Sequence, residues 1–169
     1  MLRKTGLAAL TVLTLSLTAC GGPDSYTLRS DLCEVLDYQA FSRWFGQVRP
    51  EPGGSVSAAK VACHARGVGP AGANLLTRVE AYKYDSPDDA KQVFDRFGKQ
   101  QSDLDAELET SVDDARYYRG NLILVLDGDL YLTVRVQPEA ADDSSFKEDL
   151  PRLTVEFADQ VLEHLREKS

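Results

Sequence analysis

The chain has 169 residues, enough for one domain whose core folds without a metal ion. Acidic residues outnumber basic residues by 27 to 19, which gives a net charge of −8. An acidic protein is repelled by phosphate backbones, so the composition argues against nucleic-acid binding.

The first twenty residues have the pattern of an export signal. Arg3 and Lys4 form a basic start, residues 7–17 are largely apolar, and Leu17-Thr18-Ala19-Cys20 closes the segment. The apolar run is shorter than the roughly 20 residues that span a bilayer, so it predicts a cleaved signal. The last four residues resemble a bacterial lipobox, which implies diacylation of Cys20 and cleavage before it. The alternative is an ordinary cleaved signal with Cys20 left over by chance.

These features predict a signal peptide over 1–19, a lipidated N-terminus and tether over 20–29, and a single domain over 30–169. Cleavage would remove Arg3, Lys4 and no acidic residue, which takes the net charge from −8 to −10. A domain this acidic has no basic patch to hold it on anionic lipid. We therefore expect an extracytoplasmic protein, anchored to the cell membrane by the lipid on Cys20.

Two helix signals begin the domain. Asp31 and Glu34 have the spacing of a capping box, and Asp37 can cap a second helical stretch that ends at Gly46. In that stretch Phe41, Trp44 and Phe45 recur at helical spacing. Residues 49–55 are expected to form a loop.

Alternating apolar and polar residues predict strands over 58–66 and 75–84. Between them GVGPAG, residues 67–72, has the G-x-G-x-x-G spacing of a dinucleotide-binding loop. Such a loop must open a helix whose N-terminus holds the pyrophosphate. A second strand follows instead, so we expect a hairpin connection and no cofactor.

The next helix is predicted from Ser86 and Pro87, which suit the N-cap and first helical positions. An apolar stripe continues it to Phe97. Residues 100–110 are acidic and weakly periodic, which indicates either a frayed continuation or a loop. Within them, the charges of Asp103 to Glu109 are interpreted as a solvated run.

Strands are then predicted over 112–119, 122–126 and 130–136, the last two joined by the hairpin signal Asp127-Gly128-Asp129. A polar loop over 138–145 leads to an amphipathic helix over 150–165. The order is α-β-β-α-β-β-β-α. Because short turns join neighbouring strands, we expect an α+β fold with a five-stranded antiparallel sheet and helices packed on one face.

The chain has three cysteines, so at least one is left over if the others pair in an exported protein. If Cys20 carries lipid, Cys33 and Cys63 remain, and an oxidising compartment favours their pairing. Such a bond would tie the first helix to the first strand and contribute about 3.5 kcal/mol in the chain-entropy model. A free reactive thiol is the alternative.

Residues 31–46, DLCEVLDYQAFSRWFG, resemble the N-terminal signature of a family of actinobacterial lipoproteins whose domain has no established function. Its pattern is Asp-x-Cys-x-Leu-Leu, a Thr or Asp cap and a helix ending in Gly, and Cys63 matches its second, strand-borne cysteine. The aromatic residue that usually follows two positions later is Ala65 here. The resemblance implies an exported, lipid-anchored α/β domain and no established reaction.

The sequence offers few candidates for catalysis. His64 lies on the polar side of its strand, and His164 lies near the end of the last helix, where a cation complements the helix dipole. No nucleophile motif or zinc-binding spacing accompanies them. Asp127, Asp129 and the pair Asp142-Asp143 offer oxygens to calcium, but turn formation and solubility explain them better. We expect no catalytic residue, metal or cofactor.

Tyrosine and arginine gather on the polar side of the predicted sheet. Such a face can stack on flat groups and bind anionic ones through bidentate hydrogen bonds, although it is also what a solvated sheet face needs. The residues are Arg78, Glu80, Tyr82, Tyr84, Tyr131, Thr133 and Arg135, joined by Arg116 and Tyr118 if Ala115 and Tyr117 face the core.

These observations predict a non-catalytic domain that binds or senses a small molecule or protein at the cell envelope. One alternative is an accessory or structural subunit of a membrane-associated complex, which would expose an apolar patch. The other is an envelope hydrolase, which would need a carboxylate and a serine beside His64.

Overall fold

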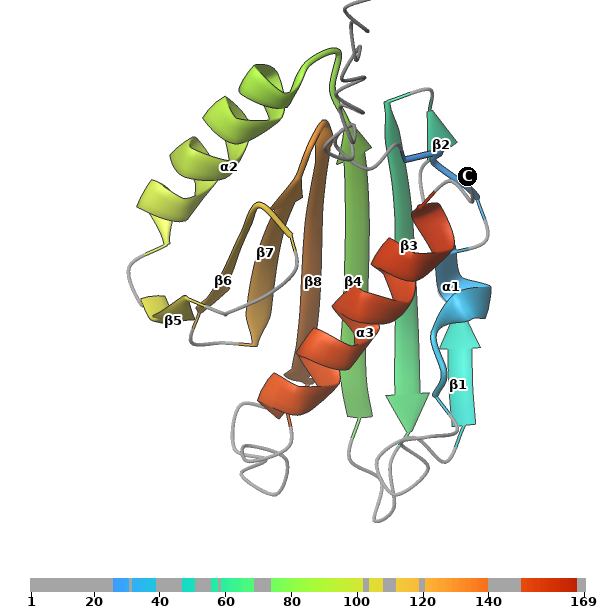
Figure 1. Cartoon of the computed structure of the whole chain (residues 1–169). Helices are drawn as coiled ribbons and strands as arrows, with labels where there is room; N and C mark the ends of the chain where they lie inside the picture. The colour runs from blue at the N-terminus through green and yellow to red at the C-terminus, as the bar shows by residue number, and fades with distance from the viewer. Residues whose placement is uncertain are drawn as a thin grey trace, which may run out of the picture.

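The computed structural model describes residues 26–30, 32–38, 47–50, 56–57, 59–68, 74–101, 104–107, 112–118, 121–139 and 150–166 (Figure 1). The strands are β1 (Gln47–Pro50), β2 (Val56–Ser57), β3 (Lys60–Val68), β4 (Asn74–Lys83), β5 (Leu104–Glu107), β6 (Asp114–Tyr118), β7 (Leu122–Asp127) and β8 (Leu130–Pro138). The helices are α1 (Leu32–Val35), α2 (Pro87–Gln100) and α3 (Leu150–Leu165). Within these residues the strands form one antiparallel sheet in the order β1-β3-β4-β8-β7-β6-β5, with β2 also paired to β3.

The predicted α+β class and element order are confirmed. The five predicted strands correspond to β3, β4, β6, β7 and β8, which are contiguous in the middle of the sheet. Val68 at the end of β3 pairs with Asn74 at the start of β4, so the segment between them joins two adjacent antiparallel strands. The GVGPAG stretch therefore leads into a strand, as a hairpin connection does.

Short strands at the sheet edges correct two predictions. Gln47–Pro50 forms β1 where a loop was expected from Arg49, and Leu104–Glu107 forms β5 inside the acidic segment. Each pairs with only one neighbour, β1 with β3 and β5 with β6. Backbone pairing to an open edge needs no alternating side chains, which explains why the sequence pattern missed both strands. The predicted helix ending at Gly46 lies largely outside the described residues.

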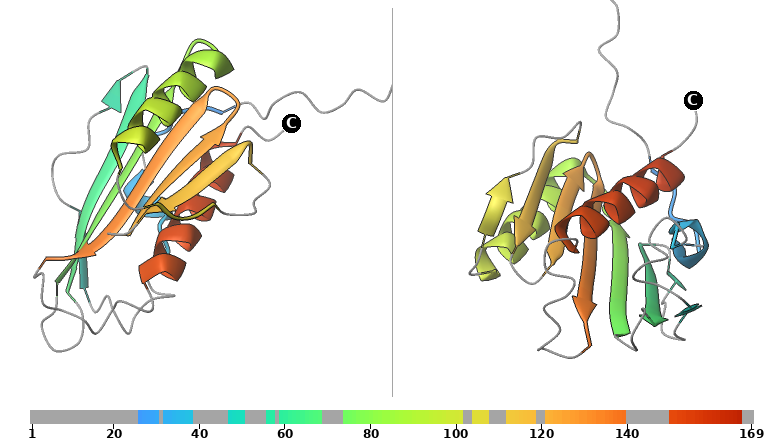
Figure 2. Two further views of the ribbon diagram at one scale, coloured as in Figure 1. Left: turned by 90° about the vertical axis from the view of Figure 1, so that its left-hand side faces the viewer. Right: turned by 90° about the horizontal axis from the view of Figure 1, so that it is seen from below.

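The two longer helices lie on opposite faces of the sheet, which corrects the expectation that all helices share one face (Figure 2). Helix α3 and α1 cover one face, whose buried residues we call the first core. Helix α2 covers part of the other face through Ala90 and Phe94, and we call this cluster the second core. The reason lies in β7, where all six residues are buried, so the sheet has an apolar surface on both sides.

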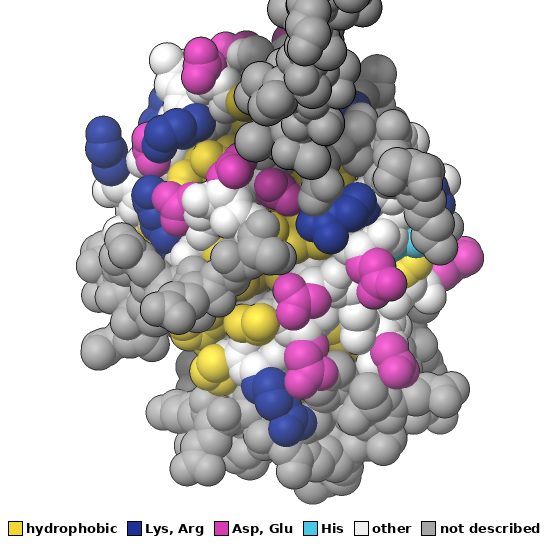
Figure 3. Space-filling model, viewed as in Figure 1, with side chains coloured by type: hydrophobic (Ala, Val, Ile, Leu, Met, Phe, Trp, Pro, Cys, Tyr) yellow, Lys and Arg dark blue, Asp and Glu magenta, His cyan; other side chains and the backbone are white. Residues whose placement is uncertain are grey.

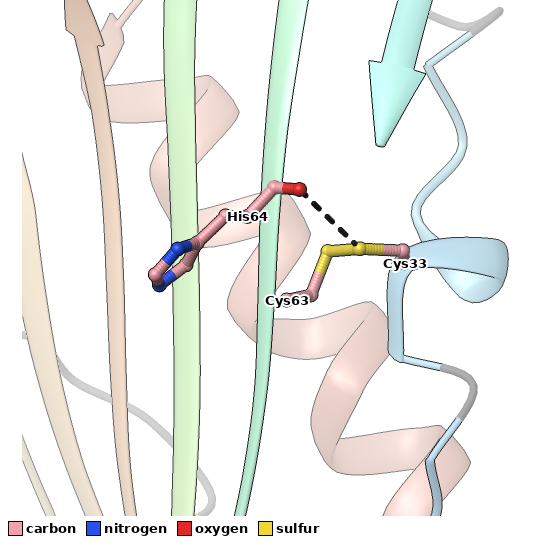
Figure 4. The surroundings of a disulfide bond; sticks show 3 residues. All are labelled: Cys33, Cys63 and His64. Carbon is pink, nitrogen blue, oxygen red and sulfur yellow. Dashed lines mark hydrogen bonds between the residues drawn. A yellow bond between two sulfur atoms is a disulfide. The ribbon is translucent and has the colours of Figure 1, made fainter. Parts of the chain in front are cut away.

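The first core contains the predicted inward positions of the strands and the stripe of α3. It includes Val61, Cys63, Ala65, Leu75, Val79, Ala81, Ala115, Tyr117, Leu132, Val134, Leu153, Phe157 and Val161. The predicted disulfide joins Cys33, which follows the start of α1, to Cys63 on β3 with a Cα–Cα distance of 5.2 Å (Figure 4). The bond ties α1 to the first-core face of the sheet.

The folded domain includes Tyr26, which lies four residues before the predicted domain boundary at residue 30. Its side chain is fully buried, and its backbone forms a β-bridge with Arg166 just after α3. The Tyr26 hydroxyl donates a hydrogen bond to Asp127, and the Lys83 ammonium donates one to the Tyr26 carbonyl oxygen. The three contacts fix the start of the domain at one end of β4 and β7.

Candidate functional site

The polar side of β3, β4 and β8 forms the face opposite the first core. The strand register aligns its side chains in rows, because directly paired residues of antiparallel neighbours point the same way. One row consists of His64, Arg78 and Arg135, and the next consists of Ala62, Glu80 and Thr133. A third row consists of Lys60, Tyr82 and Tyr131.

Helix α2 covers the end of this face that carries the third row. Tyr131 and Tyr118 are each only 3% exposed, and both belong to the second core. Burial raises the pKa of the Tyr131 hydroxyl. These two predicted ligand contacts are therefore packed beneath a helix.

Arg116 is held by the same helix. Its guanidinium lies 2.6 Å from Asp114 and 3.3 Å from Asp95 of α2, and it covers the Phe94 ring at 4.4 Å. Gly98 permits this approach, since a Cβ there would lie 3.0 Å from Nη1 of Arg116 and 2.9 Å from the Tyr118 hydroxyl. In this arrangement Arg116 joins the helix to the sheet.

Tyr82 and Tyr84 lie at the boundary between the covered and uncovered parts of the face. Both are half-buried and pack against the second core. The Tyr82 ring stacks on Tyr131 with 5.8 Å between centroids, and the Lys60 ammonium lies 4.8 Å from the centroid of the Tyr82 ring. The Tyr82 ring is therefore packed against Tyr131, and its hydroxyl donates a hydrogen bond to Glu80.

The first row lies in a depression that no described helix covers. The residues that line it are His64, Ala65, Leu76, Thr77, Arg78, Arg135 and Gln137. Its volume is about 90 Å³. We call this feature the arginine depression.

Two arginines of the depression make no ion pair or hydrogen bond within the described part of the chain. Neither the Arg78 nor the Arg135 guanidinium makes an ion pair or hydrogen bond with another residue in the described ranges. His64 points from β3 toward β4, away from the disulfide (Figure 4). Its Nε2 atom is buried and has no hydrogen-bond partner among these residues, whereas its carbonyl oxygen lies 3.7 Å from the Cys33 sulfur.

Acidic side chains flank the depression but bind other groups. Glu80 accepts hydrogen bonds from Lys60 at 3.1 Å and from Tyr82 at 3.0 Å. Burial opposes ionisation of Glu80, but the two hydrogen bonds and the positive charges of Lys60 and Arg78 outweigh it and lower the pKa of the carboxyl. On the other side, Glu139 pairs with Arg66 at 3.2 Å and accepts a hydrogen bond from Asn74 at 2.8 Å.

The other acidic candidates have structural partners. Asp127 binds Tyr26, Asp129 lies 3.6 Å from Lys83, and Gly128 between them adopts a φ of 55° in the two-residue turn. Among the described residues, no group of three or more His, Cys, Asp or Glu side chains is placed to hold a metal ion. Asp142 and Asp143 lie outside the described residues.

The histidines are far apart in the fold. His164 lies in the last turn of α3, on the first-core face, whereas His64 lies on the opposite face. Within the described ranges the His64 side chain makes no hydrogen bond to a serine or a carboxylate. The alternation of β3 predicts that His64 lies on the polar side of its strand. Gln137 lies beyond the predicted end of the last strand at residue 136, and the continued alternation of β8 is the signal that places it on the same side.

Comparisons with known proteins identify no relative. No family model, no curated protein and no solved structure matches the chain. None of the described helices is long and apolar enough to cross a membrane.

Proposed function

We propose that this protein is a lipid-anchored, non-catalytic binding domain of the bacterial cell envelope whose ligand contacts the arginine depression. One observation carries the binding part of the proposal. In an acidic chain with 27 acidic side chains, neither Arg78 nor Arg135 makes an ion pair or hydrogen bond with a carboxylate of the described residues, although the Arg78 charge acts on Glu80. Unpaired guanidiniums in a concave site are groups that a ligand can satisfy.

The anchoring part of the proposal rests on the lipobox and on the position of Tyr26. Tyr26 follows Cys20 by six residues, and an extended chain of that length reaches about 20 Å. A lipid on Cys20 would therefore hold the Tyr26 end of the domain within that distance of the membrane. The resemblance of residues 31–46 to actinobacterial lipoproteins agrees with this location and remains a prediction.

The competing functions have weaker support. An accessory subunit would use an exposed apolar patch, but in the described ranges the exposed large hydrophobic residues are Val68 on β3 and Phe97 on α2. A hydrolase would need groups that activate a nucleophile, and His64 has no such neighbour among the described residues.

Lipid anchoring is tested by growth of the expressing bacterium with an alkyne analogue of palmitate. Wild-type protein should take up the label and sediment with membranes, whereas Cys20→Ala should do neither. Label uptake by Cys20→Ala, or unlabelled wild-type protein, would exclude the proposed anchor.

Ligand binding is tested by native mass spectrometry of the purified full-length protein after incubation with envelope extract. Wild-type protein should retain an adduct that Arg78→Ala and Arg135→Ala lose. Arg152→Ala, which removes an exposed positive charge from α3 on the opposite face, is the matched control. An adduct that survives in both depression variants would show that the ligand binds elsewhere.

A further inference from the structure

Arg78 and Arg135 form a like-charge pair at the centre of the arginine depression. They occupy directly opposed positions on β4 and β8. Like charges in such positions destabilise a sheet. The described residues supply no carboxylate between them, so the fold keeps an unfavourable pair that a bound anion would relieve.

The two carboxylates that flank the depression, Glu80 and Glu139, form their ion pairs with other basic residues. Glu80 lies two residues along β4 from Arg78 but binds Lys60 and Tyr82, and Glu139 binds Arg66 and Asn74 at the end of β8. Each nearby acid is thus held by its own basic residue. As far as the described residues go, the central arginines keep their hydrogen-bond donors for a group from outside the chain.

His64 supplies a third polar group. It pairs directly with Arg78 across β3 and β4, and its Nε2 atom is buried without a partner. Buried polar atoms in native proteins nearly always have a hydrogen-bond partner. In the tautomer with a proton on Nε2, His64 can donate to the same acceptor as Arg78.

We propose that the arginine depression binds one oxyanion, the phosphate or carboxylate group of a small molecule, through Arg78, Arg135 and Nε2 of His64. This inference rests on the proposed function and names the chemical class of its ligand. Planar guanidiniums present parallel N–H donors that match the spacing of carboxylate and phosphate oxygens. The depression, with a volume of about 90 Å³, has room for such a charged group.

The surface over α3 provides a contrast. It carries acidic side chains interspersed with a few basic ones (Figure 3). Such a surface repels anions. Arg29, His164 and Arg166 nevertheless line a cavity of about 300 Å³ beside α3, so anion binding there has to be measured separately.

The test uses the two histidines as probes, because the chain has no others. Full-length protein with ¹³C at the histidine Cε1 atoms is held in dodecyl maltoside, a detergent without charge. Inorganic phosphate, sulfate or acetate is added, and chloride is exchanged to keep the ionic strength constant. We expect a saturable shift of the His64 resonance, while His164, which lies beside Arg29 and Arg166 on the opposite face, reports any second anion site.

Variants assign the shift to the depression. Arg78→Gln and Arg135→Gln should each weaken the affinity at least tenfold, whereas Arg152→Gln should leave it within twofold. Saturation by phosphate alone identifies a phosphate group as the ligand, and saturation by acetate alone identifies a carboxylate. Either result supports the oxyanion site.

Two results would overturn the inference. One is the lack of a saturable His64 shift with all three anions, and the other is a shift that persists unchanged in both arginine variants. If simple oxyanions fail while an adduct from envelope extract still depends on Arg78 and Arg135, the proposed binding function stands without this ligand class. If the adduct is also independent of both arginines, the proposed function fails as well.

Discussion

The Tyr26 hydroxyl donates a hydrogen bond to Asp127, which lies 101 positions later in the chain. The Arg166 guanidinium lies 3.7 Å from the same carboxylate. The interaction joins the segment that follows Cys20 to the turn between β7 and β8 and to the end of α3. Tyr26 thereby attaches the N-terminal segment to the rest of the domain.

Replacement of Tyr26 by Phe should lower the free energy of unfolding by about 1–3 kcal/mol, because a buried carboxylate loses a hydrogen bond. Urea denaturation followed by circular dichroism measures the loss. Tyr84→Phe is the control, since the Tyr84 hydroxyl has no partner in the described ranges. Equal destabilisation by the two substitutions would contradict the assigned role of Tyr26.

Gly98→Ala should destabilise the protein, although alanine is preferred over glycine in helices by about 1 kcal/mol. The added Cβ would lie 2.9 Å from the Tyr118 hydroxyl and 3.0 Å from Nη1 of Arg116. Both side chains are held in place, so the crowding should outweigh the helix preference by about 1 kcal/mol. Lys99→Ala, at the next and exposed position, should change the thermal midpoint little. A higher midpoint for Gly98→Ala would show that α2 packs less closely than described.

Arg78→Gln should leave the anion-free protein as stable as wild type or more stable by about 0.5 kcal/mol, because it removes the repulsion from Arg135. Phosphate should then raise the thermal midpoint of wild type and leave that of the variant unchanged. Arg116→Gln should instead cost about 1–2 kcal/mol, since Asp114 loses its cation and Asp95 keeps only Lys91. Similar destabilisation by both substitutions would show that Arg78 is needed for packing.

The hydrogen bonds to Glu80 predict a pH dependence of stability. The folded-state pKa of Glu80 lies below its ordinary value of 4.5, so its stabilising contribution is present above pH 4.5 and is lost as the pH falls through the lower value. At pH 6, Glu80→Gln should be less stable than wild type by about 0.5 kcal/mol, and the difference should shrink as the pH falls below 4.5. Lys60→Met should reduce the same dependence. A constant difference between pH 3 and pH 6 would contradict this account.

Loss of the disulfide should cost about 3.5 kcal/mol, because the Cys33–Cys63 bond closes a loop with a sequence separation of 30. Dithiothreitol should lower the thermal midpoint of wild type and have no effect on the double variant Cys33→Ala, Cys63→Ala. Oxyanion affinity of the folded double variant should match that of wild type, since the bond lies on the face opposite the depression. If dithiothreitol left the thermal midpoint of wild type unchanged, the disulfide would add no stability.

Local patterns determined the central part of the fold. Alternation placed Val79 and Ala81 on one side of β4 and Arg78 and Glu80 on the other, and the structure has the same division. Ser86 caps α2 by accepting a hydrogen bond from the Asp89 N–H at 3.2 Å, as the sequence predicted. These features depend on neighbours within a few residues, which is why a single sequence reveals them.

Tertiary structure decided which of the polar side chains are available. The sequence placed Tyr131, Arg116 and Arg135 on the same face, but α2 covers the first, engages the second and leaves the third open. The face on which α2 packs depends on the apolar surface that β7 shares with its neighbours, and no local pattern specifies it. The pairing of Arg78 with Arg135 likewise depends on the register between β4 and β8, which are distant in the chain. Alternation alone assigns a residue to a side of its strand, whereas long-range pairing and helix packing decide what lies beside it.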